Sequence, residues 1–266
     1  MTISAATLAG GEKNQDRYAY GDDWAFVLDG ASSFATDQPE HDGGWYAERL
    51  KNALVEELTS NPDDATTDIV ARAIDVAASA HDDPETCPTS TIALARWSSE
   101  TVEAYVLGDS TVALIGEGDE TVLTNTRVAD VAPSLRKEYR SRLRQGHGFD
   151  EEHRALLQDL QEHQAMARNR PGGYWIAGAE PKAANKADLI AVQRDTLTAI
   201  VLASDGAASC VTYKTVPTWG RFAAIGPHNA VHATHAIEAA DSNASQWPRS
   251  KPHDDKTAIV IDLSGD

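Results

Sequence analysis

The chain contains little cysteine and no long apolar run. Only two of its 266 residues are cysteine, Cys87 and Cys210, and their separation fits neither a disulfide framework nor a metal-binding spacing. We expect both to be reduced structural thiols in an intracellular protein. The N-terminus lacks the basic start and apolar core of a signal peptide, and no stretch is long enough to cross a bilayer. The sequence therefore predicts a cytoplasmic protein with no membrane partner.

Basic residues are scarce as well. Lysine and arginine together number 23 against 41 aspartates and glutamates, which gives a net charge of −18. Nucleic acids are bound through basic surfaces, so we expect no nucleic-acid partner. No linker rich in proline, glycine or serine interrupts the chain, which indicates a single domain over residues 1–266. The composition leaves the oligomeric state open.

Carboxylates stand at the ends of apolar runs that have the length of buried strands. If those strand ends converge, the carboxylates repel one another, and a shared cation is the simplest way to keep them ionised. Hard divalent ions such as Mg²⁺ or Mn²⁺ prefer such an all-oxygen environment. The aspartates and their runs are Asp29 after 25–28, Asp109 after 104–107, Asp205 after 199–203 and Asp254 before 257–261.

Each aspartate taken alone has a simpler interpretation. Asp-Gly and Gly-Asp-Ser are common at strand exits, where the residues only form a turn. The repetition of the pattern along the whole chain favours the metal centre over four unrelated turns. A further acidic site, Asp16, lies shortly before the first run.

Hydrophobic periodicity predicts a layered α+β arrangement. Helical spacing of apolar residues predicts helices at 45–58 and 65–80, and a charged helix is expected at about 150–168. Two helices next to a cluster of strands are typical of a layered sandwich. Strands are predicted at 2–8, 17–29, 89–97, 101–108 and 111–115.

These motifs, taken in order, resemble the metal-dependent serine/threonine protein phosphatases of type 2C. The resemblance covers nearly the full chain and implies a four-layer αββα sandwich with two central antiparallel sheets. It also implies a binuclear Mg²⁺ or Mn²⁺ centre that activates a water for hydrolysis of a phosphomonoester. The motifs are Asn14-Gln15-Asp16-Arg17, Val27-Leu28-Asp29-Gly30, Ser90-Thr91, Gly108-Asp109-Ser110, Ala203-Ser204-Asp205-Gly206 and Asp254-Asp255-Lys256-Thr257.

The resemblance also implies a role for each site residue. Asp29 and the carbonyl of Gly30 correspond to the bridge between the two ions, and Asp205 and Asp254 complete the ligands of one ion. Asp16 would act on the second ion through water. Asp109 with Asp205 resembles the optional third-metal site of the family. Asp29, Asp205 and Asp254 are therefore the expected catalytic residues.

The chain departs from the family pattern at three places. Ala31 stands where many relatives have a histidine, a candidate general acid, directly after the Asp-Gly pair. Gln15 replaces an acidic residue that is often seen beside Asp16. The arginine that many relatives place before this pair is missing, so Lys13, Arg17 or Arg170 would have to contact phosphate. Arg168 is another candidate, although a structural role is favoured for Arg168 and Arg170 when each is taken alone.

Two other features have competing interpretations. The three histidines at 228, 232 and 235 share one helical face, and without a ligand partner at a recognisable spacing they are best explained as an exposed polar stripe. His253 is either a partner of Asp254 or without a role. Residues 126–171 include a basic segment and are expected to form either a flap beside the site or only a solvated helix pair.

The expected function is thus dephosphorylation of phosphoserine and phosphothreonine in proteins. One alternative is a phosphatase-like binding module with weak or no activity, although a dead domain has no physical need for a costly carboxylate cluster. Another alternative is a phosphatase for small phosphorylated metabolites.

Overall fold

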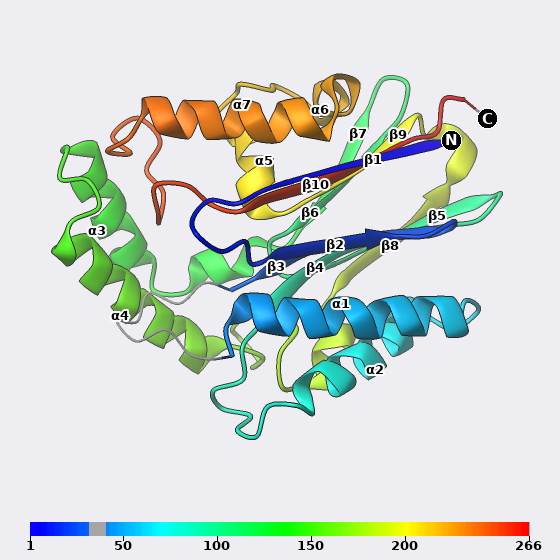
Figure 1. Cartoon of the computed structure of the whole chain (residues 1–266), viewed down its shortest axis with the longest axis horizontal. Helices are drawn as coiled ribbons and strands as arrows, with labels where there is room; N and C mark the ends of the chain where they lie inside the picture. Colours follow the sequence, from blue (N-terminus) through cyan, green and yellow to red (C-terminus); the bar gives the residue numbers. More distant parts are fainter. Residues whose placement is uncertain (32–40, 266) are drawn as a thin grey trace.

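The computed structural model describes residues 1–31 and 41–265, and ten strands in this part of the chain form two antiparallel sheets (Figure 1). The first sheet has the order β1 (Thr2–Leu8), β10 (Lys256–Asp262), β9 (Ala199–Ala203), β6 (Thr111–Ile115) and β7 (Glu120–Thr124). The second has the order β2 (Asp16–Tyr20), β3 (Trp24–Gly30), β4 (Ser90–Trp97), β5 (Thr101–Leu107) and β8 (Asp188–Gln193).

Helices cover the outer face of each sheet, so the molecule has four layers (Figure 1). The second sheet is covered by α1 (Gly43–Ser60) and α2 (Thr66–Ala78), and the first by α5 (Asp205–Thr212), α6 (Trp219–Ile225) and α7 (Pro227–Ala240). This arrangement confirms the predicted αββα sandwich. Three short 3₁₀ segments connect elements within residues 41–265: η1 (Thr126–Asp130), η2 (Pro181–Lys186) and η3 (Arg194–Thr196).

The inner strands β3, β4, β6, β9 and β10 read as continuous apolar runs because both of their faces are buried. In β3 the side chains of Ala25 and Val27 pack in the cluster between the two sheets. Phe26 and Leu28 point the other way and pack with residues of α1 and α2, such as Leu50 and Ile74. All four strand residues are fully buried, so the run continues until the chain reaches the carboxylate of Asp29.

Two helices lie outside the layers, at one end of the sandwich (Figure 1). They are α3 (Pro133–Arg144) and α4 (Glu151–Ala167), and the second matches the charged helix expected at about 150–168. Tyr139, Leu143 and Leu157 contribute to a small apolar core that the pair has of its own. The pair is therefore packed rather than merely solvated.

Most predicted elements agree with the structure to within one or two residues. The strand expected at 17–29 is instead a hairpin of β2 and β3, turned at residues 21–23. The backbone N–H of Gly21 donates to the carbonyl of Trp24 over 2.8 Å, which closes that turn. Within the described residues, no helix combines the length and the apolar character that crossing a bilayer requires.

A close backbone approach at the start of α5 gives a test of the fold. A Cβ at Gly206 would lie 2.0 Å from the backbone oxygen of Asp255. We expect Gly206→Ala to lower the free energy of unfolding by roughly 1–3 kcal/mol, the usual cost of overpacking. Urea denaturation measures the change. Gly118→Ala is the control because a Cβ there meets nothing within 4 Å. Equal stability of the two variants would contradict this packing.

Candidate metal centre

The sheet register brings the predicted strand ends to one edge of the first sheet. Ala203 at the end of β9 pairs with Ala258 on one side and with Thr111 on the other. Asp205 follows Ala203 by two residues, Asp109 precedes Thr111 by two, and Asp254 precedes β10. The antiparallel order therefore places these three carboxylates together, as the sequence predicted.

The second sheet contributes the other two carboxylates. Asp16 at the start of β2 pairs directly with Asp29 near the end of β3. The hydroxyl of Ser204, which follows β9, donates to Asp16 Oδ2 over 2.8 Å and so joins the two sheets at this point. All five predicted carboxylates thus lie at the same end of the sandwich.

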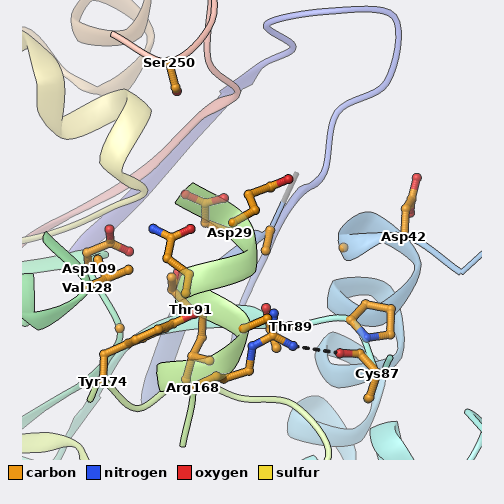
Figure 2. A pocket seen from close by; sticks show the side chains of 18 of the residues that line it. Asp29, Asp42, Cys87, Thr89, Thr91, Asp109, Val128, Arg168, Tyr174 and Ser250 are labelled. Atoms are coloured by element: carbon orange, nitrogen blue, oxygen red, sulfur yellow. Dashed lines mark hydrogen bonds between the residues drawn. The ribbon is translucent and has the colours of Figure 1, made fainter. Parts of the chain in front are cut away.

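A cavity of about 750 Å³ opens over this cluster. Asp29, Asp109, Asp205 and Asp254 line it, and Figure 2 shows Asp29 and Asp109 pointing into the same space. Helix α4 forms part of the wall with Gln158, Gln161 and Ala165, among other residues. The 126–171 region therefore stands beside the site, as the flap interpretation expects.

Burial and mutual repulsion make these carboxylates reluctant to ionise. Burial, with smaller contributions from the charges of Asp254 and Asp255, raises the pKa of Asp16 to about 7. Burial and the charges of Asp254 and Asp109 raise the pKa of Asp205 to about 8. Burial and the charges of Asp16, Asp205 and Asp254 raise the pKa of Asp29 well above its ordinary value. In the absence of a compensating cation, the cluster would hold protons near neutral pH.

The donor set fits a hard divalent cation. Every candidate ligand is an oxygen, which Mg²⁺ and Mn²⁺ prefer. Asp16 Oδ1 is buried and has no hydrogen-bond partner among the described residues, an expensive arrangement for a carboxylate oxygen unless a cation or an ordered water faces it. Four neighbouring carboxylates with raised pKa values, one of which has an unsatisfied oxygen, are the features expected of a site for Mg²⁺ or Mn²⁺.

The loop before β10 is fixed by its own polar contacts. The carboxylate of Asp255 accepts the backbone N–H of Gly10 at 2.7 Å and that of Gln15 at 2.9 Å. Lys256 Nζ donates to the carbonyl of Asp254 at 2.6 Å. A Cβ on Gly10 would lie 2.4 Å from the backbone carbon of Asp254. The glycine-rich segment thus supports Asp254 through its backbone, and Asp255 is a site residue that the sequence interpretation missed.

The three cations predicted to contact phosphate lie elsewhere. Lys13 is largely exposed and lies 3.7 Å from Asp42. Arg17 donates to Glu48 at 2.6 Å and to the backbone oxygens of Asn14 and Asp16. Arg170 is exposed. None of the three is among the residues that line the cavity, so any contact with substrate would require them to move.

Arg168 and Lys251 line the cavity instead. Arg168 Nη1 donates to the carbonyl of Cys87 at 3.3 Å, as Figure 2 shows, and its Nε is buried without a partner among the described residues. Lys251 Nζ lies 2.6 Å from Asp254 Oδ1. Burial lowers the pKa of Lys251, but the charges of Asp254 and Asp29 outweigh that effect, so the net pKa lies above the ordinary value.

Ala31, the residue directly after the Asp29-Gly30 pair, faces the cavity. Ala31 is exposed and lines it, so no imidazole is present at that position.

The two cysteines are free and buried. Burial raises the pKa of each thiol to about 11, which agrees with structural rather than reactive cysteines.

The predicted histidine stripe is correct only in part. His228 and His232 are exposed, but His235 is half-buried and its ring stacks on that of His253 with centroids 4.0 Å apart. His235, Glu238 and His253 bring possible ligand atoms within 4.8 Å of one another. Glu238 is already paired with the fully buried ammonium of Lys256 at 2.7 Å. That charge would repel a divalent ion, so the group is a buried ion-pair cluster.

Comparison with known proteins agrees with this geometry. The family model described as Protein phosphatase 2C matches residues 5–240. No curated protein sequence matches the chain. The solved structures that are similar to it include the catalytic domain of the serine/threonine phosphatase PstP in complex with two manganese ions, with 15% identity, a TM-score of 0.56 and coverage of 98% of this chain and 97% of that one.

Two other solved structures are similar over nearly their whole length. The PPM Ser-Thr phosphatase MsPP from Mycobacterium smegmatis, in complex with cacodylate, is 18% identical with a TM-score of 0.57, and the match covers 99% of this chain and 98% of that one. The serine/threonine phosphatase Stp1 from Staphylococcus aureus is 12% identical with a TM-score of 0.59, covering 99% and 95%. At these identities the likeness establishes the fold.

The raised carboxyl pKa values predict how stability depends on pH. Without metal, the folded state keeps protons on Asp16 and Asp205 that the unfolded chain loses above pH 4, since their folded pKa values are about 7 and about 8 against 3.8. The free energy of unfolding should therefore fall as pH rises from about 4 to 8. We expect Asp205→Asn in chelator at pH 8 to be more stable than the wild type by at least about 1 kcal/mol.

Urea denaturation at pH 5 and pH 8, with chelator or with Mn²⁺, measures these changes. The same variant should gain less stability from Mn²⁺ than the wild type does, because a ligand that binds only the folded state stabilises it by RT ln(1 + [L]/Kd), which is smaller when the ligand binds more weakly. A variant less stable than the wild type in chelator at pH 8 would contradict the electrostatic account of the cluster.

Proposed function

Because the chain belongs to the protein phosphatase 2C family, we propose that this site hydrolyses phosphoserine and phosphothreonine in proteins with two bound Mg²⁺ or Mn²⁺ ions. The observation that carries the proposal is the meeting of carboxylates from both sheets at one end of the sandwich: Asp29, Asp109, Asp205 and Asp254 line one cavity, and Asp16 pairs with Asp29. A cluster whose burial and mutual repulsion raise its pKa values has a physical use when divalent cations neutralise it. A phosphatase-like binding module has no comparable need for that cost.

Each carboxylate has a proposed role. Asp29, with the carbonyl of Gly30, would hold both ions, since it pairs with Asp16 in the hairpin and its carboxylate interacts with that of Asp205. Asp205 and Asp254 would hold one of these ions together with Asp29. Asp16 would act on the second ion through water, since its Oδ1 has no hydrogen-bond partner among the described residues. Asp109 with Asp205 would form the optional third position.

When bound, the ions supply Lewis-acid chemistry: they lower the pKa of a water and neutralise charge on the phosphoryl oxygens. The chain's own residues orient that chemistry. Asp255 and Lys256 fix the backbone around Asp254, which limits the positions its carboxylate can adopt. Ala31 offers no proton to the leaving group, so substrates with good leaving groups should react best.

Arg168 is the side chain that we propose to contact the substrate phosphoryl group. It lines the cavity, and its buried Nε–H lacks a partner among the described residues. A guanidinium can donate two parallel hydrogen bonds to phosphate oxygens. The bond to the Cys87 carbonyl holds the group against the wall. This replaces Lys13, Arg17 and Arg170 in the role for which the sequence suggested them.

Loss of the central carboxylate tests the proposed activity. Asp29→Asn keeps the shape but removes the charge, so hydrolysis should fall by at least ~10³-fold. The measurement is Mn²⁺-dependent turnover of a phosphothreonine peptide and of p-nitrophenyl phosphate. The control is Asp22→Asn, an exposed position in the turn at the far end of the same hairpin. Near-normal activity of Asp29→Asn would rule out the binuclear centre.

A pair of arginine variants tests the phosphate contact. Arg168→Met should raise KM for p-nitrophenyl phosphate and weaken inhibition by inorganic phosphate, each about tenfold, the scale of one charge-assisted hydrogen bond. Arg170→Met should leave both unchanged, because that side chain is exposed and outside the cavity wall. Circular dichroism checks that both variants fold. The reverse ranking would return the role to Arg170.

A further inference from the structure

The segment before Asp254 presents an ammonium to the carboxylate cluster. Lys251 Nζ lies 2.6 Å from Asp254 Oδ1, and only a quarter of the Lys251 side chain is exposed. Lys251 lines the same cavity as Asp29, Asp109 and Asp205. A positive charge tethered to the chain therefore occupies the edge of the proposed metal site.

The segment that bears Lys251 is held firmly. The guanidinium of Arg249 donates to the backbone oxygens of Glu238, Asp241, Trp247 and Pro252 at 2.7–3.0 Å, and it also pairs with the Asp241 carboxylate at 3.1 Å. These contacts fix the backbone on both sides of Lys251. The position of the ammonium is thus set by the loop and does not depend on a freely moving surface side chain.

A further contact ties this segment to helix α4. His153 is buried, and its Nε2 lies 2.8 Å from the carbonyl of Ser250. The guanidinium of Arg249 also lies over the ring of Phe149, 5.7 Å from its centroid. Helix α4, which forms part of the cavity wall, therefore holds Ser250, the residue next to Lys251, in place.

Two groups contact the Asp254 carboxylate, and they allow the orientation of that carboxylate to be distinguished from the effect of the Lys251 charge. Asp254 Oδ1 accepts both Lys251 Nζ and the backbone N–H of Asp255, the latter at 2.9 Å. Among the described residues no hydrogen bond reaches Oδ2, which leaves that oxygen for a metal. Without Lys251 the Asp255 N–H would still orient the carboxylate. What Lys251 alone adds is a positive charge.

We propose that Lys251 is a resident cation of the carboxylate cluster, which compensates the cluster in the metal-free protein and weakens its affinity for divalent metal. This inference rests on the proposed metal centre. The ammonium and the bound ions share Asp254, so they repel one another across a few ångströms in a partly buried site. Loss of a partner that orients a ligand usually weakens binding by 10–100-fold, but here the Asp255 N–H keeps the orientation, so the effect of charge dominates.

The test compares Lys251→Met, which keeps the length and removes the charge, with Lys251→Arg, which keeps the charge. Isothermal titration calorimetry with Mn²⁺ measures affinity, and thermal unfolding in chelator measures the metal-free protein. We expect Lys251→Met to bind Mn²⁺ at least about tenfold more tightly and to melt lower than the wild type in chelator. Lys251→Arg should remain near the wild type in both.

A surface control separates this effect from simple loss of a lysine. Lys182 pairs with Glu180 at 2.6 Å, its side chain is two-thirds exposed, and it does not line the cavity. Lys182→Met should leave Mn²⁺ affinity unchanged. If Lys251→Met does not fold, Lys251→Gln provides the same loss of charge with a polar side chain.

The outcomes distinguish this inference from the proposed function. A wild type that binds no Mn²⁺ would overturn the metal centre itself. A wild type that binds Mn²⁺, with Lys251→Met equal or weaker in affinity, would overturn the role of Lys251 alone. Unchanged Mn²⁺ affinity with a raised KM for p-nitrophenyl phosphate would also overturn it, and would assign Lys251 to the substrate phosphate.

Discussion

The structure depends on how several negatively charged carboxylates can lie together at the buried end of the two packed sheets. Both faces of β3 are buried as far as Leu28, and the next residue is the carboxylate Asp29. Four more carboxylates meet it from other strand ends, and burial and repulsion raise the pKa of several of them. Cations are the direct remedy, whether divalent ions or the ammonium of Lys251. The rest of the site serves to hold these charges at fixed positions.

The two sheets make that convergence possible. Antiparallel pairing of β9 with β6 and β10 puts Asp109, Asp205 and Asp254 at one edge, and the β2–β3 hairpin puts Asp16 opposite Asp29. The bond from Ser204 to Asp16 joins the edges. Asp255 then ties the segment between β1 and β2 to the segment before β10. The ligands therefore sit on strand ends and short connections, which move little.

The sequence predicted correctly those features that depend on the local pattern of apolar residues. Apolar runs predicted the strands and, through their ends, the meeting of the five carboxylates, because a strand's exit residue must lie at the edge of its sheet. Helical spacing predicted α1, α2 and α4. The turn at residues 21–23 was missed within a predicted strand, although Gly21-Asp22-Asp23 carries an ordinary turn signal.

Side chains placed by tertiary contacts were not predictable. Lys251 stands in a segment of proline, serine and charged residues that looks like an ordinary surface loop, and its position at the cavity depends on the contacts of Arg249 and on that of His153 with Ser250. Arg168 and Arg170 are two residues apart, and the sequence favoured the one that lies outside the cavity wall. His235 was predicted to belong to an exposed stripe, because the sequence does not show that the ring of His253, from another segment, stacks on it.

The most direct test of the central claim is anomalous scattering from a crystal of the protein soaked in Mn²⁺. The account predicts two manganese peaks within the carboxylate cluster, both in contact with the Asp29 carboxylate, with Asp205 and Asp254 on one of them. A crystal in millimolar Mn²⁺ that shows no peak among these carboxylates, or a single ion away from Asp29, would contradict it.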